Sequence, residues 1–193
     1  MYTNFKDEIK GERIVLRINK PEITLAKNVF KTIDENREHL KPWFIWVDLT
    51  LKVEDTLKYF FDINQKLLDG NKVEYGIFLN DVFIGNIALF DFNDKNKSAE
   101  IGYWLSEKHT RKGYMTEAVK LLEKEGFENL NLNRILLKCD EKNIASTGVA
   151  KKNNYVLEGT LRKDVWSDYF NNFRNSLYFS KLKEEWLKEQ NKC

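Results

Sequence analysis

The chain has 193 residues, of which 42% are hydrophobic and 32% are charged, and its net charge at neutral pH is +2. This composition suits one globular domain over residues 1–193 and excludes a disordered chain. So small a charge does not suit a protein that mainly binds nucleic acid. The sequence contains no apolar run of about eighteen residues, so no membrane span is predicted. Because the N-terminal segment lacks the apolar core of a secretion signal, we expect a cytoplasmic protein.

The first half of the chain mixes strand and helix patterns. Apolar residues at alternate positions predict strands over 13–18, 73–79 and 82–90, whereas three- and four-residue spacing predicts helices after Pro21 and over 54–68. The pair Asn80-Asp81 is typical of a tight hairpin turn. Neighbouring strands joined by such short turns are expected to be antiparallel.

Three aromatic residues, Trp43, Phe44 and Trp46, cluster after Pro42 without a clear period. Large aromatic side chains usually bury, which favours a hydrophobic plug over the core. The other interpretation is a loop that faces a substrate, and the pattern alone leaves both open.

The middle of the chain changes from a strand pattern to a helix pattern. Residues 99–105, AEIGYWL, alternate in polarity, and apolar residues from Met115 to Leu130 recur at helical spacing. The polar segment 110–115 therefore runs into a helix N-terminus, where unpaired N–H groups and the helix dipole can bind a phosphate. Gly113 allows close approach of the backbone. The alternative is an ordinary turn with solvated basic residues.

The last third predicts one further strand, over 134–139, that follows the long helix and can therefore be parallel to the 99–105 strand. Asn143 is suited to capping a short helix over 144–153. A closing hairpin over 156–166 and 173–180 and a terminal helix over 182–190 complete the expected elements.

Three segments of the chain, AEIGYWL, GYMTEAV and NIASTGVAKKNNY, resemble the GNAT superfamily of acetyl-CoA-dependent N-acyltransferases. The similarity extends over nearly the whole chain. Within the superfamily, the segments most resemble the RimJ/RimL branch, which acetylates protein N-termini. It implies an α/β (α+β) GNAT fold, with a mixed, mostly antiparallel twisted sheet of about seven strands and helices on both faces. The family motif Gln/Arg-x-x-Gly-x-Gly/Ala has Thr110, Gly113 and Met115 at its three defined positions here, so two of them depart.

The resemblance implies acetyl-CoA as co-substrate and no metal. It also implies two strands that splay around the coenzyme, and an oxyanion held by a backbone N–H near Trp104 or Leu105. The family usually has Gly where this chain has Asn154, a residue that tolerates the left-handed conformation. The residues expected to contact the coenzyme are Trp104, Leu105, Thr110, Arg111, Lys112, Gly113, Tyr114, Met115, Asn143 and Ser146.

Acyl transfer to an amine needs a base, an oxyanion site and a proton for the leaving thiolate. Glu100 is our candidate base, with a solvated or ion-paired glutamate as the alternative. Many GNAT enzymes place a proton-donating tyrosine where this chain has Ala150, and the branch has a serine that matches Ser146. Helix capping is the other interpretation of Ser146. His109 can titrate near neutrality, although we expect it at the surface.

The acceptor side is expected to contain Glu100 and, by the resemblance, the loop with Trp43, Phe44 and Trp46. Two cysteines, Cys139 in a strand and Cys193 at the end, form no disulfide framework and suggest no acyl-enzyme nucleophile, so transfer should be direct in a ternary complex. The resemblance favours a protein N-terminal α-amine as acceptor. Dimers are frequent in the branch, so a homodimer is a further expectation. The alternatives are a small polyamine, an amine-bearing antibiotic or toxin, and a non-catalytic acetyl-CoA-binding module.

Overall fold

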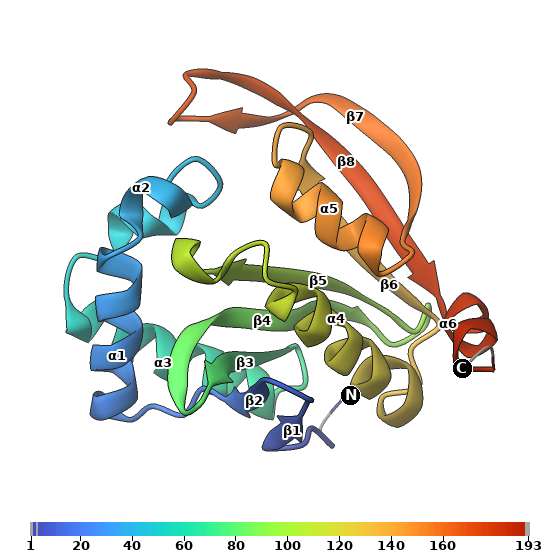
Figure 1. Cartoon of the computed structure of the whole chain (residues 1–193), viewed down its shortest axis with the longest axis horizontal. Helices are drawn as coiled ribbons and strands as arrows, with labels where there is room; N and C mark the ends of the chain where they lie inside the picture. Colours follow the sequence, from blue (N-terminus) through green and yellow to red (C-terminus); the bar gives the residue numbers. More distant parts are fainter. Residues whose placement is uncertain (1, 3, 192–193) are drawn as a thin grey trace.

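The chain folds around one open sheet whose eight strands are ordered β1-β2-β3-β4-β5-β6-β8-β7 (Figure 1). The computed structural model describes residue 2 and residues 4–191, so Cys193 lies outside the described residues. All neighbouring strands pair antiparallel except β5 and β6, which are parallel. The strands are β1 (Glu8–Lys10), β2 (Val15–Ile18), β3 (Lys72–Leu79), β4 (Val82–Asn93), β5 (Ser98–Leu105), β6 (Arg134–Asp140), β7 (Val156–Ser167) and β8 (Asn172–Leu182).

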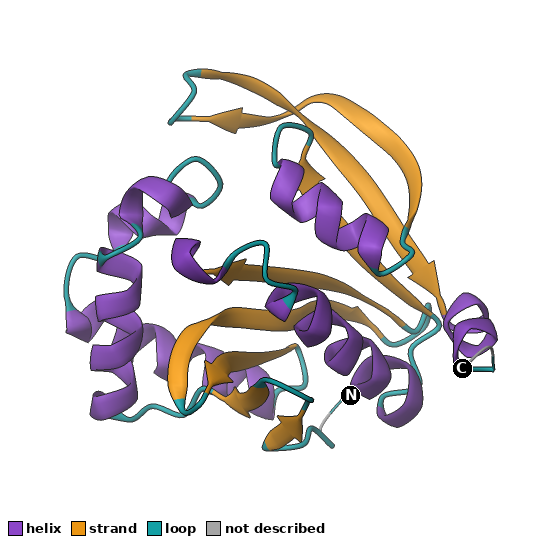
Figure 2. Ribbon diagram, in the orientation of Figure 1, coloured by secondary structure: helices purple, strands orange, loops and turns teal. Residues whose placement is uncertain are grey.

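Helices connect these strands and cover both faces of the sheet (Figure 2). The α-helices are α1 (Ile23–Asp34), α2 (Arg37–Leu40), α3 (Val53–Leu68), α4 (Tyr114–Lys124), α5 (Ile144–Lys152) and α6 (Lys183–Gln190). Short 3₁₀ turns lie at Ile45–Leu49 and Glu107–His109, and α4 continues as a π-helical turn at Glu125–Asn129. Within the described residues, none of these helices combines the length and apolar character that crossing a bilayer requires.

The predicted strands and long helices are confirmed, with small differences at their ends. The short edge strand β1 and helix α2 were not expected, because neither carries enough residues to show a period. The helix expected over 115–130 begins at Tyr114 and changes to π-helical geometry at Glu125. The tight turn expected at Asn80-Asp81 is confirmed, as is the left-handed conformation expected at Asn154; the φ angles of the three residues are 49°, 62° and 57°.

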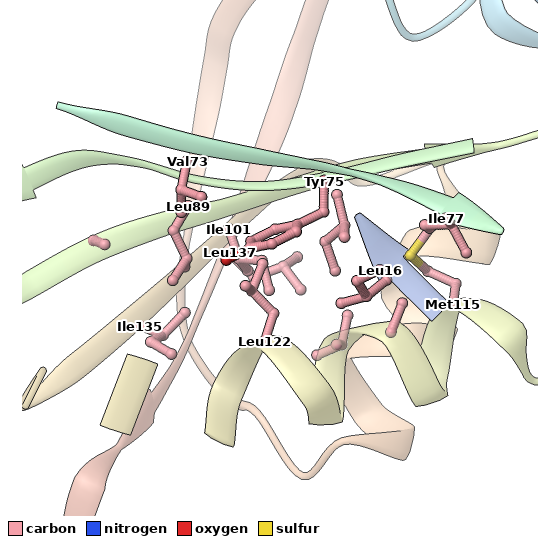
Figure 3. Packing of buried hydrophobic residues seen from close by; sticks show 14 of the residues in the cluster. Leu16, Val73, Tyr75, Ile77, Leu89, Ile101, Met115, Leu122, Ile135 and Leu137 are labelled. Atoms are coloured by element: carbon pink, nitrogen blue, oxygen red, sulfur yellow. The ribbon is translucent and has the colours of Figure 1, made fainter. Parts of the chain in front are cut away.

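Two hydrophobic clusters pack on opposite faces of the sheet. The first joins β-strand side chains to α4, and Figure 3 shows Met115 of that helix beside Leu16 and Ile77, and Leu122 below Ile101 and Leu137. The second joins α1 and α3 to residues such as Phe78, Phe83 and Trp104. Since successive side chains of a strand point to opposite faces, the central strands β3, β4 and β5 contribute to both clusters.

The parallel pair β5–β6 is hydrogen-bonded along only part of its length. Register partners run from Ser98↔Arg134 to Glu100↔Leu136, although β5 continues to Leu105 and β6 to Asp140. Beyond Glu100, β5 remains paired with β4 and β6 remains paired with β8. The two halves of the sheet therefore diverge from this point, as the resemblance implied, and the divergence leaves room for a ligand.

Candidate active site

A cavity of about 790 Å³ opens where β5 and β6 diverge. Its walls come from the ends of β5 and β6, the turn before α4, the first part of α5, the segment around α2, and the tip of the β7–β8 hairpin. Glu100 and every residue expected to contact the coenzyme except Lys112 line this cavity. The structure therefore brings together, in one cavity, side chains from Glu100 to Ser146 that lie on separate elements of the chain.

The turn before α4 has the backbone geometry of a ligand-binding segment. Arg111 and Gly113 both adopt left-handed conformations, with φ of 58° and 84°. Such a conformation is uncommon for a residue other than glycine and occurs often at ligand sites. Gly113 is the N-cap residue of α4, and no side chain caps the first amides of that helix. The uncapped end of α4 and the left-handed turn thus form one wall of the cavity.

Alternate side chains of β5 lie on opposite faces of the sheet. Trp104 packs in the cluster with α1 and α3, whereas Ile101 and Leu105 pack in the cluster with α4. By the two-residue period of a strand, Glu100 lies on the same face as Trp104, and Tyr103 lies on the α4 face, where it packs against that cluster. The two titratable groups of this strand are therefore separated by the sheet itself.

Glu100 is half-buried at the point where the two strands separate. Burial and the nearby charge of Asp91 raise the pKa of its carboxyl, and Lys138 partly opposes this effect. A carboxylate with a raised pKa accepts a proton more readily near neutral pH than an ordinary surface glutamate does.

On the α4 face, the phenol of Tyr103 meets the first turn of α5. Its hydroxyl lies 3.0 Å from the Ser146 hydroxyl oxygen and donates to the Ser146 carbonyl at 3.4 Å. Burial raises the pKa of Tyr103, so the phenol stays protonated. The Asn143 side chain accepts a hydrogen bond from the Ser146 backbone N–H at 3.0 Å, which is the expected cap. Ala150 is fully buried in the core.

Tyr103 is a candidate functional residue that the sequence did not indicate. The sequence shows only that it alternates in phase with Ile101 and Leu105, and the structure packs it against the same cluster as those two residues. The proximity of Ser146, however, depends on where β6 and α5 lie relative to β5, and no local pattern carries that information.

The backbone of β5 presents one class of donor to the cavity. The N–H of Ser106 donates to the Ile84 carbonyl of β4 at 2.9 Å. Because N–H groups alternate sides along a strand, the N–H of Trp104 also points to β4 and the N–H of Leu105 points to the opposite edge. This edge faces the gap toward β6, so Leu105 is the better placed of the two oxyanion donors considered.

The aromatic segment after Pro42 divides between the two interpretations. Trp43 and Phe44 line the cavity, and the ring of Trp43 lies 6.1 Å from that of Phe170 in the β7–β8 hairpin. Trp46 is not a lining residue and packs on Trp104, with ring centroids 6.0 Å apart. The plug therefore describes Trp46, whereas Trp43 and Phe44 line the cavity, and their contact with a substrate stays a prediction.

Two further titratable groups line the cavity. The Ser106 hydroxyl oxygen lies 2.6 Å from His109 Nδ1, and burial together with Lys108 and Lys112 lowers the pKa of that imidazole, which is partly exposed. Burial raises the pKa of the Cys139 thiol, so little of it is thiolate at neutral pH. The described residues contain no group of three or more His, Cys, Asp or Glu able to hold a metal ion.

The splayed parallel pair β5–β6 and the left-handed, uncapped start of α4 are the features that the resemblance to the acetyl-CoA-dependent acyltransferases implied. The family model described as "Acetyltransferase (GNAT) domain" matches residues 13–156, and the chain belongs to this family. It is an acetyl-CoA-dependent N-acetyltransferase.

Named relatives and solved structures agree with this assignment. The chain is 31% identical over 138 residues to the ribosomal-protein-serine acetyltransferase of Escherichia coli (strain K12), covering 72% of this chain and 77% of the relative. It is 32% identical over 170 residues to the probable N-acetyltransferase YjcK of Bacillus subtilis (strain 168), covering 83% and 93%. The structure of RimL, a ribosomal L7/L12 α-N-protein acetyltransferase in complex with coenzyme A, superimposes with a TM-score of 0.85 at 21% identity, covering 92% of this chain and 99% of that one.

Proposed function

We propose that this chain transfers an acetyl group directly from acetyl-CoA to the α-amine of a protein N-terminus, within a ternary complex. The observation that carries the proposal is the divergence of β5 and β6 after Glu100, which opens a cavity with Glu100 on one face of the sheet and Tyr103 and Ser146 on the other. Two substrates can then meet in the gap from opposite faces. The thiol of Cys139 is a poor nucleophile, which favours direct transfer over an acyl-enzyme.

On the α4 face, main-chain amides from Arg111 to Met115 bind the diphosphate of the coenzyme. The left-handed turn and the uncapped helix end support this assignment, since both present N–H groups to an anion. Thr110 and Tyr114 line the same wall. Lys112 contributes charge at a distance, because it does not line the cavity.

On the opposite face, Glu100 takes the proton of the incoming ammonium, directly or through a water. The nitrogen attacks the acetyl carbonyl, and the N–H of Leu105 stabilises the oxyanion. The C–S bond then breaks. The proton that the attacking nitrogen loses as it becomes the amide reaches the Ser146 oxygen through water, while the Ser146 hydroxyl donates its own proton to the leaving thiolate. The hydrogen bond from Tyr103 stabilises the serine oxygen as it loses that proton.

The acceptor assignment rests on the names of the relatives, several of which act on ribosomal proteins. An open cavity partly walled by Trp43 and Phe44 can receive a chain end. The same scaffold also serves small amines, so a polyamine or an amine-bearing antibiotic is the second outcome of the test.

A thiol-release assay with acetyl-CoA tests the proposal directly. Peptides that begin with Ser or Ala are compared with the same peptides blocked at the N-terminus, with an internal lysine, and with polyamines. Turnover confined to free peptide N-termini supports the proposal, and turnover only with polyamines refutes it. Mass spectrometry of protein N-termini in cells with and without the chain then identifies the target. The cytoplasmic location and the homodimer remain predictions, and light scattering of the purified chain tests the second.

A further inference from the structure

Arg13 does not line the cavity, but it contacts the turn before α4 and the first residues of that helix. Arg13 precedes β2, and its Nε donates to Glu117 Oε2 at 2.8 Å while its Nη1 donates to the Lys112 carbonyl at 2.9 Å. The guanidinium carbon lies 5.0 Å from the centre of the Tyr114 ring. The backbone N–H of Arg13 also donates to Glu117 Oε1 at 2.9 Å. The arginine and the first turn of α4 are therefore held as one unit.

The hydrogen bond to Lys112 orients the next amide. A peptide unit is planar and trans, so the Lys112 carbonyl and the Gly113 N–H point in opposite directions. With the carbonyl held by Arg13, the Gly113 N–H points away from the guanidinium. A Cβ on Gly113 would lie 3.2 Å from Arg13 Nη2, so the arginine also fills the side of the turn that a side chain would occupy.

We propose that Arg13 is a positioning residue for the coenzyme, which it serves through the Lys112 carbonyl by orienting the Gly113 N–H toward the diphosphate. This inference rests on the proposed function, in which the turn binds that group. The planar guanidinium suits the task because it bonds a carboxylate and a carbonyl at the same time, and a lysine ammonium lacks this fixed fork.

The alternative is that the charge of Arg13 attracts the diphosphate directly. Its side chain is 48% exposed and is paired with Glu117, so solvent and the partner charge reduce its long-range attraction. The two explanations predict opposite changes in coenzyme affinity for Glu117→Gln. Removing a negative charge next to the coenzyme should tighten binding if charge dominates, but it should weaken binding if Glu117 anchors the arginine that orients the turn.

The experiment measures the dissociation constant of coenzyme A by calorimetry, with no acceptor present. We expect Arg13→Lys to raise it about tenfold and Glu117→Gln to raise it severalfold. The matched control is Arg17→Lys in the strand β2 that follows Arg13. Arg17 is 38% exposed, pairs with Glu8 and Asp81, and does not contact the turn, so this change should leave the constant unchanged. In steady state, Arg13→Lys should raise KM for acetyl-CoA and leave kcat and KM for the amine within twofold.

Tighter binding in Glu117→Gln, or full retention of affinity in Arg13→Lys, would overturn the positioning role alone. A wild-type protein that binds no coenzyme A would overturn the coenzyme site and this inference together. Melting curves of each variant identify any loss of affinity that comes from unfolding, and Glu117→Gln keeps an acceptor oxygen so that the fold has the better chance of surviving.

Discussion

Tyr103→Phe removes one hydroxyl and tests the proposed path of the proton to the thiolate. The hydroxyl lies 3.0 Å from the Ser146 oxygen, and burial raises the pKa of Tyr103, so the phenol acts as a neutral donor at every pH of interest. A neutral hydrogen bond of this kind contributes about 0.5 to 1.5 kcal/mol, which corresponds to a loss of about two- to tenfold in kcat. Ser146→Ala removes the donor itself and should cost about a hundredfold or more.

The combination of the two changes is the informative measurement. If Tyr103 acts only through Ser146, adding Tyr103→Phe to Ser146→Ala should change kcat by less than about twofold, because coupled residues are not additive. The assay is thiol release under single-turnover conditions, where chemistry limits the rate. An equal loss in both backgrounds would refute the relay.

A matched control separates this effect from the loss of any buried hydroxyl. Tyr75 is fully buried, and its hydroxyl donates to the Lys6 carbonyl at 2.9 Å, away from the cavity. Tyr75→Phe should lower stability to a similar extent as Tyr103→Phe and leave kcat unchanged.

Three further predictions concern the base, the turn and the stability of the core. Glu100→Gln should lower the rate most at low pH, since a peptide α-amine loses its proton unaided above about pH 8; a pH–rate profile of unchanged shape would remove Glu100 from this role. Gly113→Ala should weaken coenzyme A binding about tenfold in calorimetry, because an L-residue at φ 84° costs about 1–2 kcal/mol and its Cβ crowds Arg13, whereas Gly159→Ala, whose Cβ meets nothing within 4 Å, should have no effect. Burial raises the pKa of Glu123 to about 7, so its contribution to stability is complete below about pH 4.5 and is lost as the pH rises through 7. The free energy of unfolding of Glu123→Gln lacks this pH dependence. Measured by denaturant unfolding, the difference in free energy of unfolding between variant and wild type should therefore shift in favour of the variant by up to about 3 kcal/mol from pH 4.5 to pH 8. A difference that does not change with pH would contradict the assignment.

The sequence by itself determined the elements that local chemistry controls. Alternating polarity predicted β5, and helical spacing predicted the buried face of α4. The resemblance, together with the tolerance of asparagine for a positive φ, predicted the left-handed turn at Asn154. These predictions succeed because a period of two or 3.6 residues, or a positive φ, restricts which residue types fit at each position.

Only the tertiary structure decided which of these elements meet. Tyr103 and Ser146 are far apart in the sequence, as are Arg13 and Lys112, and their contacts depend on the order of strands in the sheet and on the point where β5 and β6 stop pairing. No local pattern encodes that point, because strand pairing is a long-range choice among competing registers that packing resolves for the chain as a whole. The same non-local choice divided the aromatic segment, packing a partly buried Trp46 against the core and placing Trp43 at the cavity.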